Sequence, residues 1–418
     1  MKLIKTSFFS SIVTLIRILS GFASSKIVAI FTGASGIAII GMFTNFITVI
    51  LNFANGAINT GVIKYTAEID GDEKRLESLF STSLKITICS SIFIGALLFS
   101  FAHVLSQEIF NSDSYYVLIR VFAGTLLFYS LNTLLISILN GKREIKSYTI
   151  VNVIGSIVGL LVTLILVYYY KLAGAMYALV LSQSVALFVT VTLVIKSSWF
   201  KWRYFMQPFS KKIAIKLSHY SLMTIVSAIT VPIGQIVLRN MVISKISLES
   251  AGYWQGMMRV SDGYLLLITT SLSVYYLPQL SSLKTNEGLK REVWNAYKIL
   301  LPVVALGCGV IYFLRFFIID VLYTREFRFM EDLFIWQLVG DFFKIATWIL
   351  AYWMLAKSMT TLFIFTEIMF NITYVILGYV LINYYKLQGV TIAFAINYFL
   401  SFIFMLIVFR SLIVKKNG

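Results

Sequence analysis

Charge is scarce in this sequence. Only 13% of its 418 residues are charged, whereas 59% are hydrophobic. A soluble domain is about one quarter charged, so a water-soluble fold of this size would lack the polar side chains to cover its surface. We therefore expect a chain that has lipid as its solvent, with its backbone polar groups hydrogen-bonded internally.

The residues that catalysis and metal binding need are also few. The chain has two histidines, and its two cysteines, Cys89 and Cys308, fall in apolar runs without a metal-binding spacing. We predict that both cysteines are small core residues. Neither a G-x-x-x-x-G-K-[ST] phosphate loop nor an H-E-x-x-H motif occurs in the sequence. We expect a transporter rather than an enzyme, with no cofactor and no metal, driven by an ion gradient or by the substrate gradient.

Long apolar runs are abundant instead. Many reach about 20 residues, which is the length of a membrane-spanning helix rather than of a barrel strand. The sequence predicts twelve such helices joined by short loops, so that neighbours pack antiparallel. They cover residues 8–31, 37–61, 79–104, 116–139, 148–169, 173–195, 217–242, 251–277, 294–319, 333–355, 362–382 and 390–412.

The basic residues are unevenly distributed between the predicted loops. If the amino terminus is cytoplasmic, 20 lysines and arginines fall in cytoplasmic segments and 5 in the opposite loops. Cytoplasmic loops of membrane proteins carry such an excess, so both termini are predicted to be cytoplasmic. Topology also accounts for the net charge of +17, and we expect no nucleic-acid partner.

One short motif occurs twice. Tyr169–Gly174 reads YYKLAG and Tyr384–Gly389 reads YYKLQG, each just before the last helix of a six-helix half. The motif indicates either two similar tyrosine-rich interfacial turns or an internal repeat. The repeat predicts an amino-terminal lobe over 1–196 and a carboxy-terminal lobe over 217–418, with the substrate near the midplane between them.

The join between these lobes, residues 197–216, is both basic and aromatic. With Lys196 it carries six basic residues interleaved with tryptophan, tyrosine and phenylalanine. Such a composition is typical of a cytoplasmic interfacial segment held to anionic headgroups, so membrane lipids are expected partners. A specific lipid or regulatory site is the alternative interpretation.

Several cations fall inside the predicted spans. An ionised side chain in hydrocarbon costs about 3 kcal/mol or more, so each should face a wet cavity or a partner. We predict that they line a cationic, substrate-binding cavity, although Arg120 and Lys85 have the alternative of reaching an interface. The six cavity candidates are Arg17, Lys26, Arg120, Arg239, Arg259 and Lys344.

Acidic residues are absent from the six spans predicted in the first half and present in the second. Arg259 and Asp262, like Asp341 and Lys344, are spaced i, i+3, which places each pair on one helix face. These pairs are either structural ion pairs or a proton or cation coupling site. Coupling is conceivable because burial raises the pKa of a carboxyl group while a nearby cation lowers it, so that loss of the cation to a substrate would change its protonation. Glu367 is a third candidate proton carrier.

The second predicted helix has a polar stripe. Its asparagines fall on one face at about 100° per residue, where they would either hydrogen-bond sugar hydroxyls or join neighbouring helices. Pro232 in the seventh helix is a candidate kink that lets the two lobes rock. The stripe comprises Asn45, Thr48, Asn52, Asn55 and Asn59.

Some of these stretches resemble a known family. The segments YWQG at Tyr253–Gly256, SVYYLP at Ser273–Pro278 and FIWQLVGD at Phe334–Asp341 are similar to those of Wzx-type polysaccharide flippases of the MOP exporter superfamily. The chain looks most like the enterobacterial common antigen lipid flippases and the related O-antigen flippases. The resemblance covers nearly the whole chain, more loosely in the first half.

The resemblance implies an all-α, MATE-like fold with two lobes around a central cavity in the bacterial inner membrane. It implies transfer of an undecaprenyl-pyrophosphate-linked oligosaccharide from the cytoplasmic to the periplasmic leaflet. We expect this transfer to proceed by ion-coupled alternating access of the two lobes. The polysaccharide polymerase and the chain-length regulator are further candidate partners. Two other functions stay open: a cation-coupled, MATE-like small-molecule exporter, and a membrane scaffold for polysaccharide assembly.

Overall fold

Helices make up all the regular secondary structure in the part of the chain that the structure describes. The computed structural model describes residues 2–69, 71–110, 112–272, 276, 279, 280, 283, 285–357 and 359–410. Every regular element in these ranges is an α-helix, a π-helical turn or a 3₁₀-helix. The predicted all-α class is confirmed.

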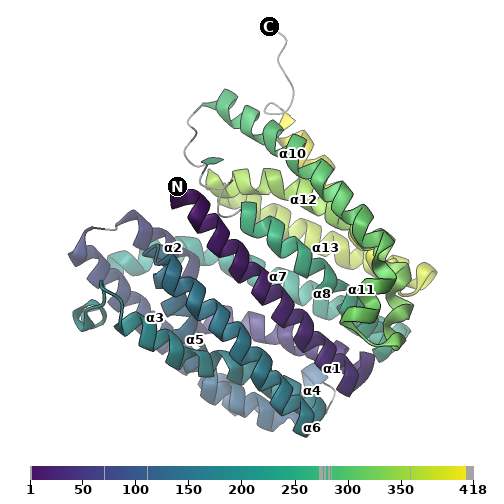
Figure 1. Cartoon of the computed structure of the whole chain (residues 1–418), viewed down its shortest axis with the longest axis horizontal. Coiled ribbons are helices and arrows are strands. Elements are labelled where there is room, and N and C mark those ends of the chain that lie inside the picture. The colour runs from purple at the N-terminus through teal and green to yellow at the C-terminus, as the bar shows by residue number, and fades with distance from the viewer. Residues whose placement is uncertain are drawn as a thin grey trace. The chain divides into compact units, whose positions relative to one another are not determined.

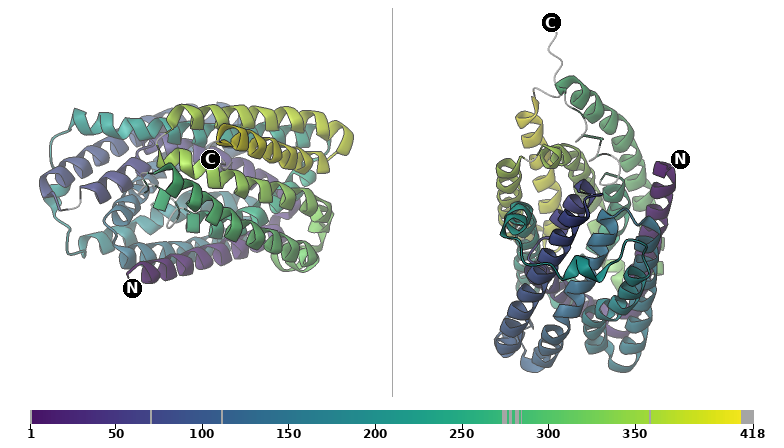
Figure 2. Two further views of the ribbon diagram at one scale, coloured as in Figure 1. Left: turned by 90° about the horizontal axis from the view of Figure 1, so that it is seen from above. Right: turned by 90° about the vertical axis from the view of Figure 1, so that its left-hand side faces the viewer.

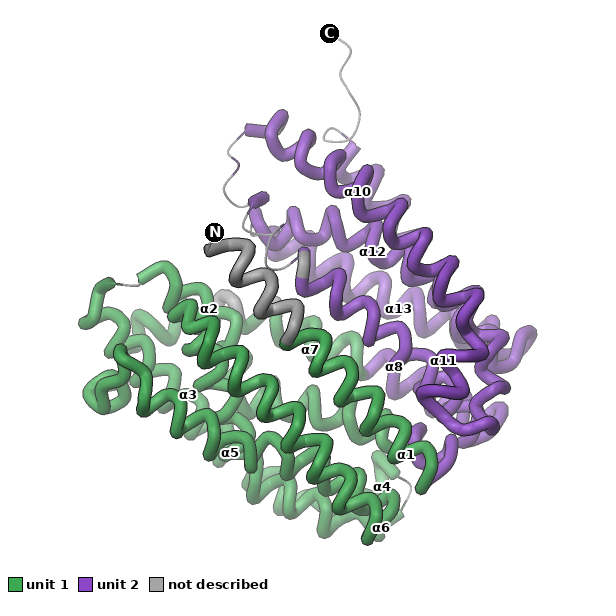
Figure 3. The backbone as a smooth tube through the Cα atoms, viewed as in Figure 1, with its two compact units in different colours: residues 1–31, 39–232 green, residues 32–38, 233–418 purple. Residues whose placement is uncertain are grey.

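The chain forms two compact units (Figure 3). Unit 1 comprises Met1–Phe31 and Ile39–Pro232, and unit 2 comprises Thr32–Ala38 and Ile233–Gly418. The main boundary between the two units, after Pro232, thus lies within the seventh predicted helix. The predicted lobes over 1–196 and 217–418, with their join, stay a prediction.

Unit 1 contains the helices of the first half of the chain (Figure 1). They are most of α1 (Lys2–Ala54), α2 (Asn59–Glu68), α3 (Glu73–Ser100), α4 (Ala102–Phe110), η1 (Asp113–Tyr115), α5 (Tyr116–Gly141), α6 (Ile145–Ile195), η2 (Trp202–Phe205) and the first part of α7 (Lys211–Lys245).

Unit 2 contains the end of α7 and the helices that follow it. They are α8 (Leu248–Ser271), α10 (Asn286–Phe313), α11 (Arg315–Leu322), η4 (Arg325–Leu333), α12 (Phe334–Ala356), α13 (Thr360–Tyr385) and α14 (Gln388–Val408). Within this unit α13 and α14 lie side by side (Figure 2), and α12 packs against α14 and α10.

The twelve predicted spans all have helical counterparts. Nine of the described helices are long and apolar enough to cross a membrane. Two of them, α1 and α6, contain a kink and hold two predicted spans each. The remaining counterpart is α8, which is less apolar because it carries Glu249, Arg259 and Asp262. The predicted ends at Leu277 and Leu412 lie outside the described residues.

The kink in α1 lies where two spans were predicted to meet. Gly33 has φ 64° and ψ −166°, a backbone conformation that glycine adopts without steric cost. The short segment Thr32–Ala38 that follows belongs to unit 2. In this unit the Ser35 hydroxyl donates to Glu249 Oε1 at 3.0 Å.

The second predicted span was wrong at its end. It was expected to reach Gly61, but α1 ends at Ala54 and the chain resumes as α2 at Asn59. Gly56 and Ala57 have φ values of 62° and 51°, and residues with positive φ interrupt a right-handed helix. The Asn-Gly pair at 55–56 is a turn signal that the apolar residues around it obscured.

The two copies of the repeated motif share an unusual backbone conformation. Lys171 within α6 has φ 49° and ψ −121°, and Lys386 between α13 and α14 has φ 50° and ψ −130°. Positive φ is uncommon for a residue with a side chain. The same exception at the same motif position supports an internal repeat over two chance turns.

The glycines of the motif also match. A Cβ atom added to Gly174 would lie 1.9 Å from the Leu166 carbonyl oxygen, and one added to Gly389 would lie 2.3 Å from that of Leu381. These distances are far below van der Waals contact, so only glycine fits where the chain folds back this closely. The turn therefore requires the glycine in both copies.

The predicted interfacial join folds against α3 in unit 1. The buried ring of Phe80 contacts Trp199, Tyr204 and Phe205, with ring centroids 5.8 to 6.0 Å apart. Trp202, by contrast, is exposed. Some aromatic side chains of the join therefore pack on Phe80 of α3, while other apolar side chains of the join lie at the surface.

Ion pairs fasten the same join. Lys201 Nζ lies 2.8 Å from Glu73 Oε1, and this hydrogen bond raises the pKa of Lys201. Arg203 Nε lies 3.1 Å from Glu77, which is buried. The third predicted span began at Leu79, whereas α3 begins at Glu73, so both acids lie in the part of the helix that precedes the predicted span.

Candidate functional site: a charged cluster within unit 2

Asp341 is a fully buried carboxylate with several donors around it. Its exposed fraction is 0%. The Ser261 hydroxyl donates to its Oδ2 at 2.7 Å, the Tyr264 hydroxyl donates to the same oxygen, and Gln337 Nε2 lies 3.4 Å from Oδ1. Ser261 and Tyr264 share a face of α8 because they are three residues apart, and Gln337 lies one turn before Asp341 on α12. The cluster joins α8 to α12.

Lys344 lies on the next turn of α12, among aromatic rings. Its ammonium is 5.0 Å from the ring centroid of Trp348, 5.5 Å from Phe394 and 5.6 Å from Tyr398. Aromatic faces attract cations, and the attraction grows when water is excluded. Three acids also act on its charge: Asp341, Asp262 and Glu367. The cation is therefore held in an aromatic setting with carboxylates within electrostatic range.

The two predicted i, i+3 pairs have different surroundings in the structure. In the part of the chain that is described, no ion pair joins Asp341 to Lys344, because hydroxyl and amide groups hold Asp341 while Lys344 faces aromatic rings. Arg259 is half-buried and Asp262 is exposed. Asp262 interacts electrostatically with both Arg259 and Lys344. All five predicted charges of α8, α12 and α13 thus belong to unit 2.

Arg239 is buried near the end of α7. Its Nη2 donates to Gln255 Oε1, and its guanidinium carbon lies 5.5 Å from the ring centroid of Trp254. Both partners belong to α8. The side chain is 1% exposed, so it is shielded from water. Its predicted position in a substrate-binding cavity stays a prediction.

The three predicted cations of unit 1 have less enclosed positions. Arg17 is exposed and Lys26 is half-buried on the first part of α1, and Arg17 acts electrostatically on Tyr129 of α5. Arg120 lies between aromatic faces, 5.0 Å from the ring centroid of Phe99 and 5.2 Å from that of Tyr116. Lys85, the candidate for an interface, donates to the Gln207 carbonyl oxygen at 2.7 Å.

The asparagine stripe does not lie on one continuous helix. Asn45 and Asn52 lie on α1, Asn55 is buried in the turn that follows, and Asn59 begins α2. Asn52 Nδ2 donates to the Thr48 carbonyl oxygen at 2.8 Å. The prediction of a single face was wrong for Asn59 because the chain turns at Gly56 and Ala57.

Sequence reasoning missed the neutral members of the cluster. Ser261, Tyr264 and Gln337 hold Asp341, and Gln255 holds Arg239. The available signal was spacing: Gln337 precedes Asp341 by four residues and therefore shares its face. The contacts of Ser261 and Tyr264 cross between helices, and one sequence gives no register for such a contact.

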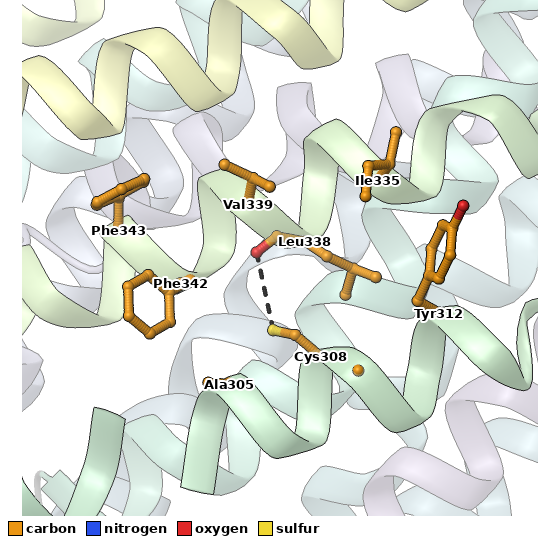
Figure 4. Close-up of a pocket in the computed structure, with 9 residues that line it drawn as sticks. Ala305, Cys308, Tyr312, Ile335, Leu338, Val339, Phe342 and Phe343 are labelled. Carbon is orange, nitrogen blue, oxygen red and sulfur yellow. Dashed lines mark hydrogen bonds between the residues drawn. The ribbon is translucent and has the colours of Figure 1, made fainter. Parts of the chain in front are cut away.

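An apolar pocket of about 390 Å³ lies between α10 and α12 (Figure 4). Cys308 and Tyr312 line it from α10, and the Cys308 thiol faces the Leu338 carbonyl oxygen at 3.7 Å. Cys308 is half-buried and Cys89 is exposed, so the prediction of a core position was wrong for Cys89. Because its lining is apolar, this pocket suits hydrocarbon rather than a charged substrate.

Among the described residues, no group of three or more His, Cys, Asp or Glu side chains is placed to hold a metal ion.

Sequence comparison decides the family. A model of the family described as polysaccharide biosynthesis protein matches residues 36–332. The chain belongs to this family. The Lipid III flippases of Escherichia coli (strain K12) and of Shigella flexneri are each 30% identical to it over 357 residues, which cover 84% of this chain and 85% of theirs. The resemblance to Wzx-type flippases is confirmed.

Solved structures show the same fold. An inward-facing multidrug resistance MATE family transporter of the MOP superfamily superposes with a TM-score of 0.80, at 15% identity, over 97% of this chain and 98% of its own. A MOP superfamily transporter from Pyrococcus furiosus, described by the reversed polarity of its binding pocket, has a TM-score of 0.73, at 15% identity, over 98% and 96% of the two chains. This chain therefore has the MOP fold. Its Lipid III flippase relatives and its long apolar helices make it a multi-pass inner-membrane protein.

Proposed function

We infer that this chain is a flippase for a lipid-linked oligosaccharide. Its family and its Lipid III flippase relatives support this function, and its MOP fold is that of transporters. The observation that supports the inference is that cations occur within helices apolar enough to cross a membrane, and of these Arg17 is exposed and Lys26 is half-buried in unit 1. A diphosphate that crosses hydrocarbon needs such charges.

The cargo that best suits these residues is an undecaprenyl pyrophosphate carrying one oligosaccharide repeat. Its headgroup is multiply anionic, and half-buried cations lower the cost of removing it from water. We assign headgroup binding to the less enclosed cations and sugar contacts to Asn45 and Asn52. The headgroup-binding set is Arg17, Lys26, Arg120, Arg259 and Lys344. The polyprenyl chain would stay in lipid while the headgroup crosses from the cytoplasmic to the periplasmic leaflet.

Asp341, Asp262 and Glu367 are the proposed coupling groups. All three act on the ammonium of Lys344, so a phosphate that approaches Lys344 competes with them for the same cation. A change in substrate occupancy would then change the protonation or cation binding of these carboxylates. Alternating access of the two lobes would link this change to transfer across the membrane.

Orientation and assembly partners belong to the same proposal. The excess of basic residues in one set of loops supports cytoplasmic positions for both termini. A flippase that supplies single repeats must act before their polymerisation, so a polysaccharide polymerase and a chain-length regulator are its proposed neighbours.

Deletion followed by lipid analysis tests the function. Cells that lack the chain should accumulate the lipid-linked repeat in the cytoplasmic leaflet, and a plasmid copy should restore surface polysaccharide. A purified copy in proteoliposomes should move the extracted lipid. If the repeat still reaches the outer leaflet at the normal rate in deletion cells, the chain is not its flippase.

Export of small molecules is the second candidate, because the structural neighbours with full coverage include multidrug transporters. The cationic side chains of unit 1 disfavour cationic drugs as cargo. Measurement of drug resistance in the same deletion strain separates the two functions. Loss of resistance with normal surface polysaccharide would support the exporter and reject the flippase.

A further inference from the structure

Arg239 is a buried cation of unit 2 whose guanidinium group is only partly hydrogen-bonded. Its Nε and Nη1 atoms are buried and have no hydrogen-bond acceptor among the described residues, and only Nη2 is used, toward Gln255. A buried ionised group without counter-charge or full hydrogen bonding is strongly destabilising. A native structure that retains one therefore suggests a ligand that completes the site.

Two further side chains near Arg239 also lack acceptors. Trp254 is 0% exposed, and its Nε1 has no acceptor in the described part of the chain. The hydroxyl of Tyr374, on α13, is buried and lacks a partner there as well, and it is close enough to Arg239 for the two to interact electrostatically. An indole N–H and a guanidinium only donate hydrogen bonds. The shared need of this group is an acceptor.

The charges near the site are of both signs, but the charged side chain that acts on Arg239 itself is a cation. Arg259 of α8 is the charged side chain that acts most strongly on Arg239 among the described residues. Asp341 acts on Tyr374, and Asp262 lies beside Arg259 on α8, but each of these acids has its own cation in range. A neutral water would satisfy the donors but leave the buried charge of Arg239 without a counter-charge. An anion satisfies the donors and supplies that counter-charge as well.

The geometry restricts the size of the anion. Arg239 and Trp254 are both almost completely buried, so a pyrophosphate that carries sugars and a polyprenyl chain does not reach this position. On α13, Asn371 packs directly on Gly234 of α7, leaving no room there for a side chain. An enclosed position of this kind suits a small monovalent anion rather than a large one, because the N–H and O–H donors come from buried side chains of several helices.

We propose that Arg239, Trp254 and Tyr374 form a buried site for a small monovalent anion, with chloride as the physiological occupant. The anion joins α7, α8 and α13 inside unit 2. The three side chains of the site are not among those assigned to headgroup binding, and the proposal does not depend on the identity of the cargo. Because a ligand that binds only the folded state stabilises it by RT ln(1 + [L]/Kd), chloride should stabilise the protein increasingly as its concentration rises above its Kd.

Thermal unfolding of the full chain in lipid nanodiscs tests the site. The melting temperature is measured while sodium gluconate is replaced by sodium chloride or sodium bromide at constant ionic strength. Halide should raise the melting temperature, with an increase that follows the logarithm of the halide concentration once this exceeds the Kd. In Arg239→Gln the apparent halide affinity should fall at least about tenfold, because hydrogen bonds to a charged group are lost. Arg315→Gln is the matched control, since Arg315 lies over the rings of Tyr312 and Phe316, and its halide curve should match the wild type.

A second variant covers the case in which Arg239→Gln does not fold. Tyr374→Phe removes one donor and keeps the ring, so it should fold and weaken the apparent affinity about threefold. A bromide-soaked crystal should show an anomalous peak beside Arg239. An identical halide response in the wild type and Tyr374→Phe, or melting temperatures that do not distinguish halide from gluconate, would overturn the proposal.

Discussion

Lys171 and Lys386 have the same left-handed backbone conformation, 215 positions apart in the chain. Their φ values are 49° and 50°, and each precedes by three residues a glycine that packs on a carbonyl oxygen. Two unrelated turns are not expected to share both a lysine with positive φ and a glycine packed against a backbone carbonyl oxygen. The two halves of the chain therefore carry the same helix–turn–helix device.

The first prediction concerns the glycines of this device. Gly174→Ala and Gly389→Ala should each destabilise the protein by about 1 to 3 kcal/mol, because the added Cβ overlaps a backbone carbonyl. Gly124→Ala is the control, since an added Cβ meets nothing within 4 Å there. Melting temperatures in nanodiscs measure the effect. A control variant that loses as much stability as the two motif variants would disprove the steric explanation.

The second prediction concerns the aromatic packing of the join. Phe80→Ala should destabilise unit 1 by about 3 kcal/mol, which is typical for a buried phenylalanine, and should expose the join to protease. Phe93→Ala on the same helix is the control, because Phe93 is 64% exposed and faces lipid or solvent. Limited proteolysis of the purified chain between residues 197 and 216 gives the readout. Equal protection in both variants would show that Phe80 does not hold the join.

The third prediction concerns Asp341. Asp341→Asn keeps an oxygen acceptor for Ser261 and Tyr264, so the protein should fold, whereas transfer driven by an ion gradient should fall at least about tenfold (about 1.4 kcal/mol in the barrier). Asp332→Asn, at an exposed position, should leave transfer unchanged. The measurement is flipping in proteoliposomes with and without a proton gradient. Normal gradient-driven rates in Asp341→Asn would remove Asp341 from the coupling role.

The fourth prediction concerns the cations of unit 1. Arg17→Ala and Lys26→Ala should each reduce flipping about tenfold while membrane insertion stays intact, because each removes a charge that the diphosphate headgroup needs. Lys74→Ala, an exposed position on α3, is the control. Surface polysaccharide and protein abundance are measured together. Normal surface polysaccharide in both Arg17→Ala and Lys26→Ala would rule out these residues as headgroup ligands.

Much of the fold was predictable because apolar length and turn residues are local signals. The spans around Gly33 and Lys171 were placed within a few residues of the observed kinks. The end of the second span was not, because Gly56 and Ala57 turn the chain inside an apolar stretch. The contact of Glu77 with Arg203 was also hidden, since it joins α3 to a segment more than 120 residues later.

The candidate site was predictable only in its charges. Asp341 and Lys344 stand out because ionisable residues are rare and costly in an apolar helix. Their partners do not stand out: Ser261 and Tyr264 are ordinary residues of α8, and their contact with Asp341 depends on the register between two helices. Trp254, which lies beside Arg239, does not stand out in the sequence either. The unpaired N–H donors of these two residues can be recognised only when the burial of the side chains is known.

The segment Thr32–Ala38 belongs to unit 2 although the rest of that unit begins at Ile233. The ribosome therefore makes this piece some two hundred residues before its neighbours on α8, where Gly252 lies against the Ala34 carbonyl oxygen. The carboxy-terminal portion cannot complete its packing during synthesis without a stretch of the first helix. Split expression of the chain at the 197–216 join would deprive the second fragment of that stretch, and the fragment should mature only when both pieces are made in the same membrane.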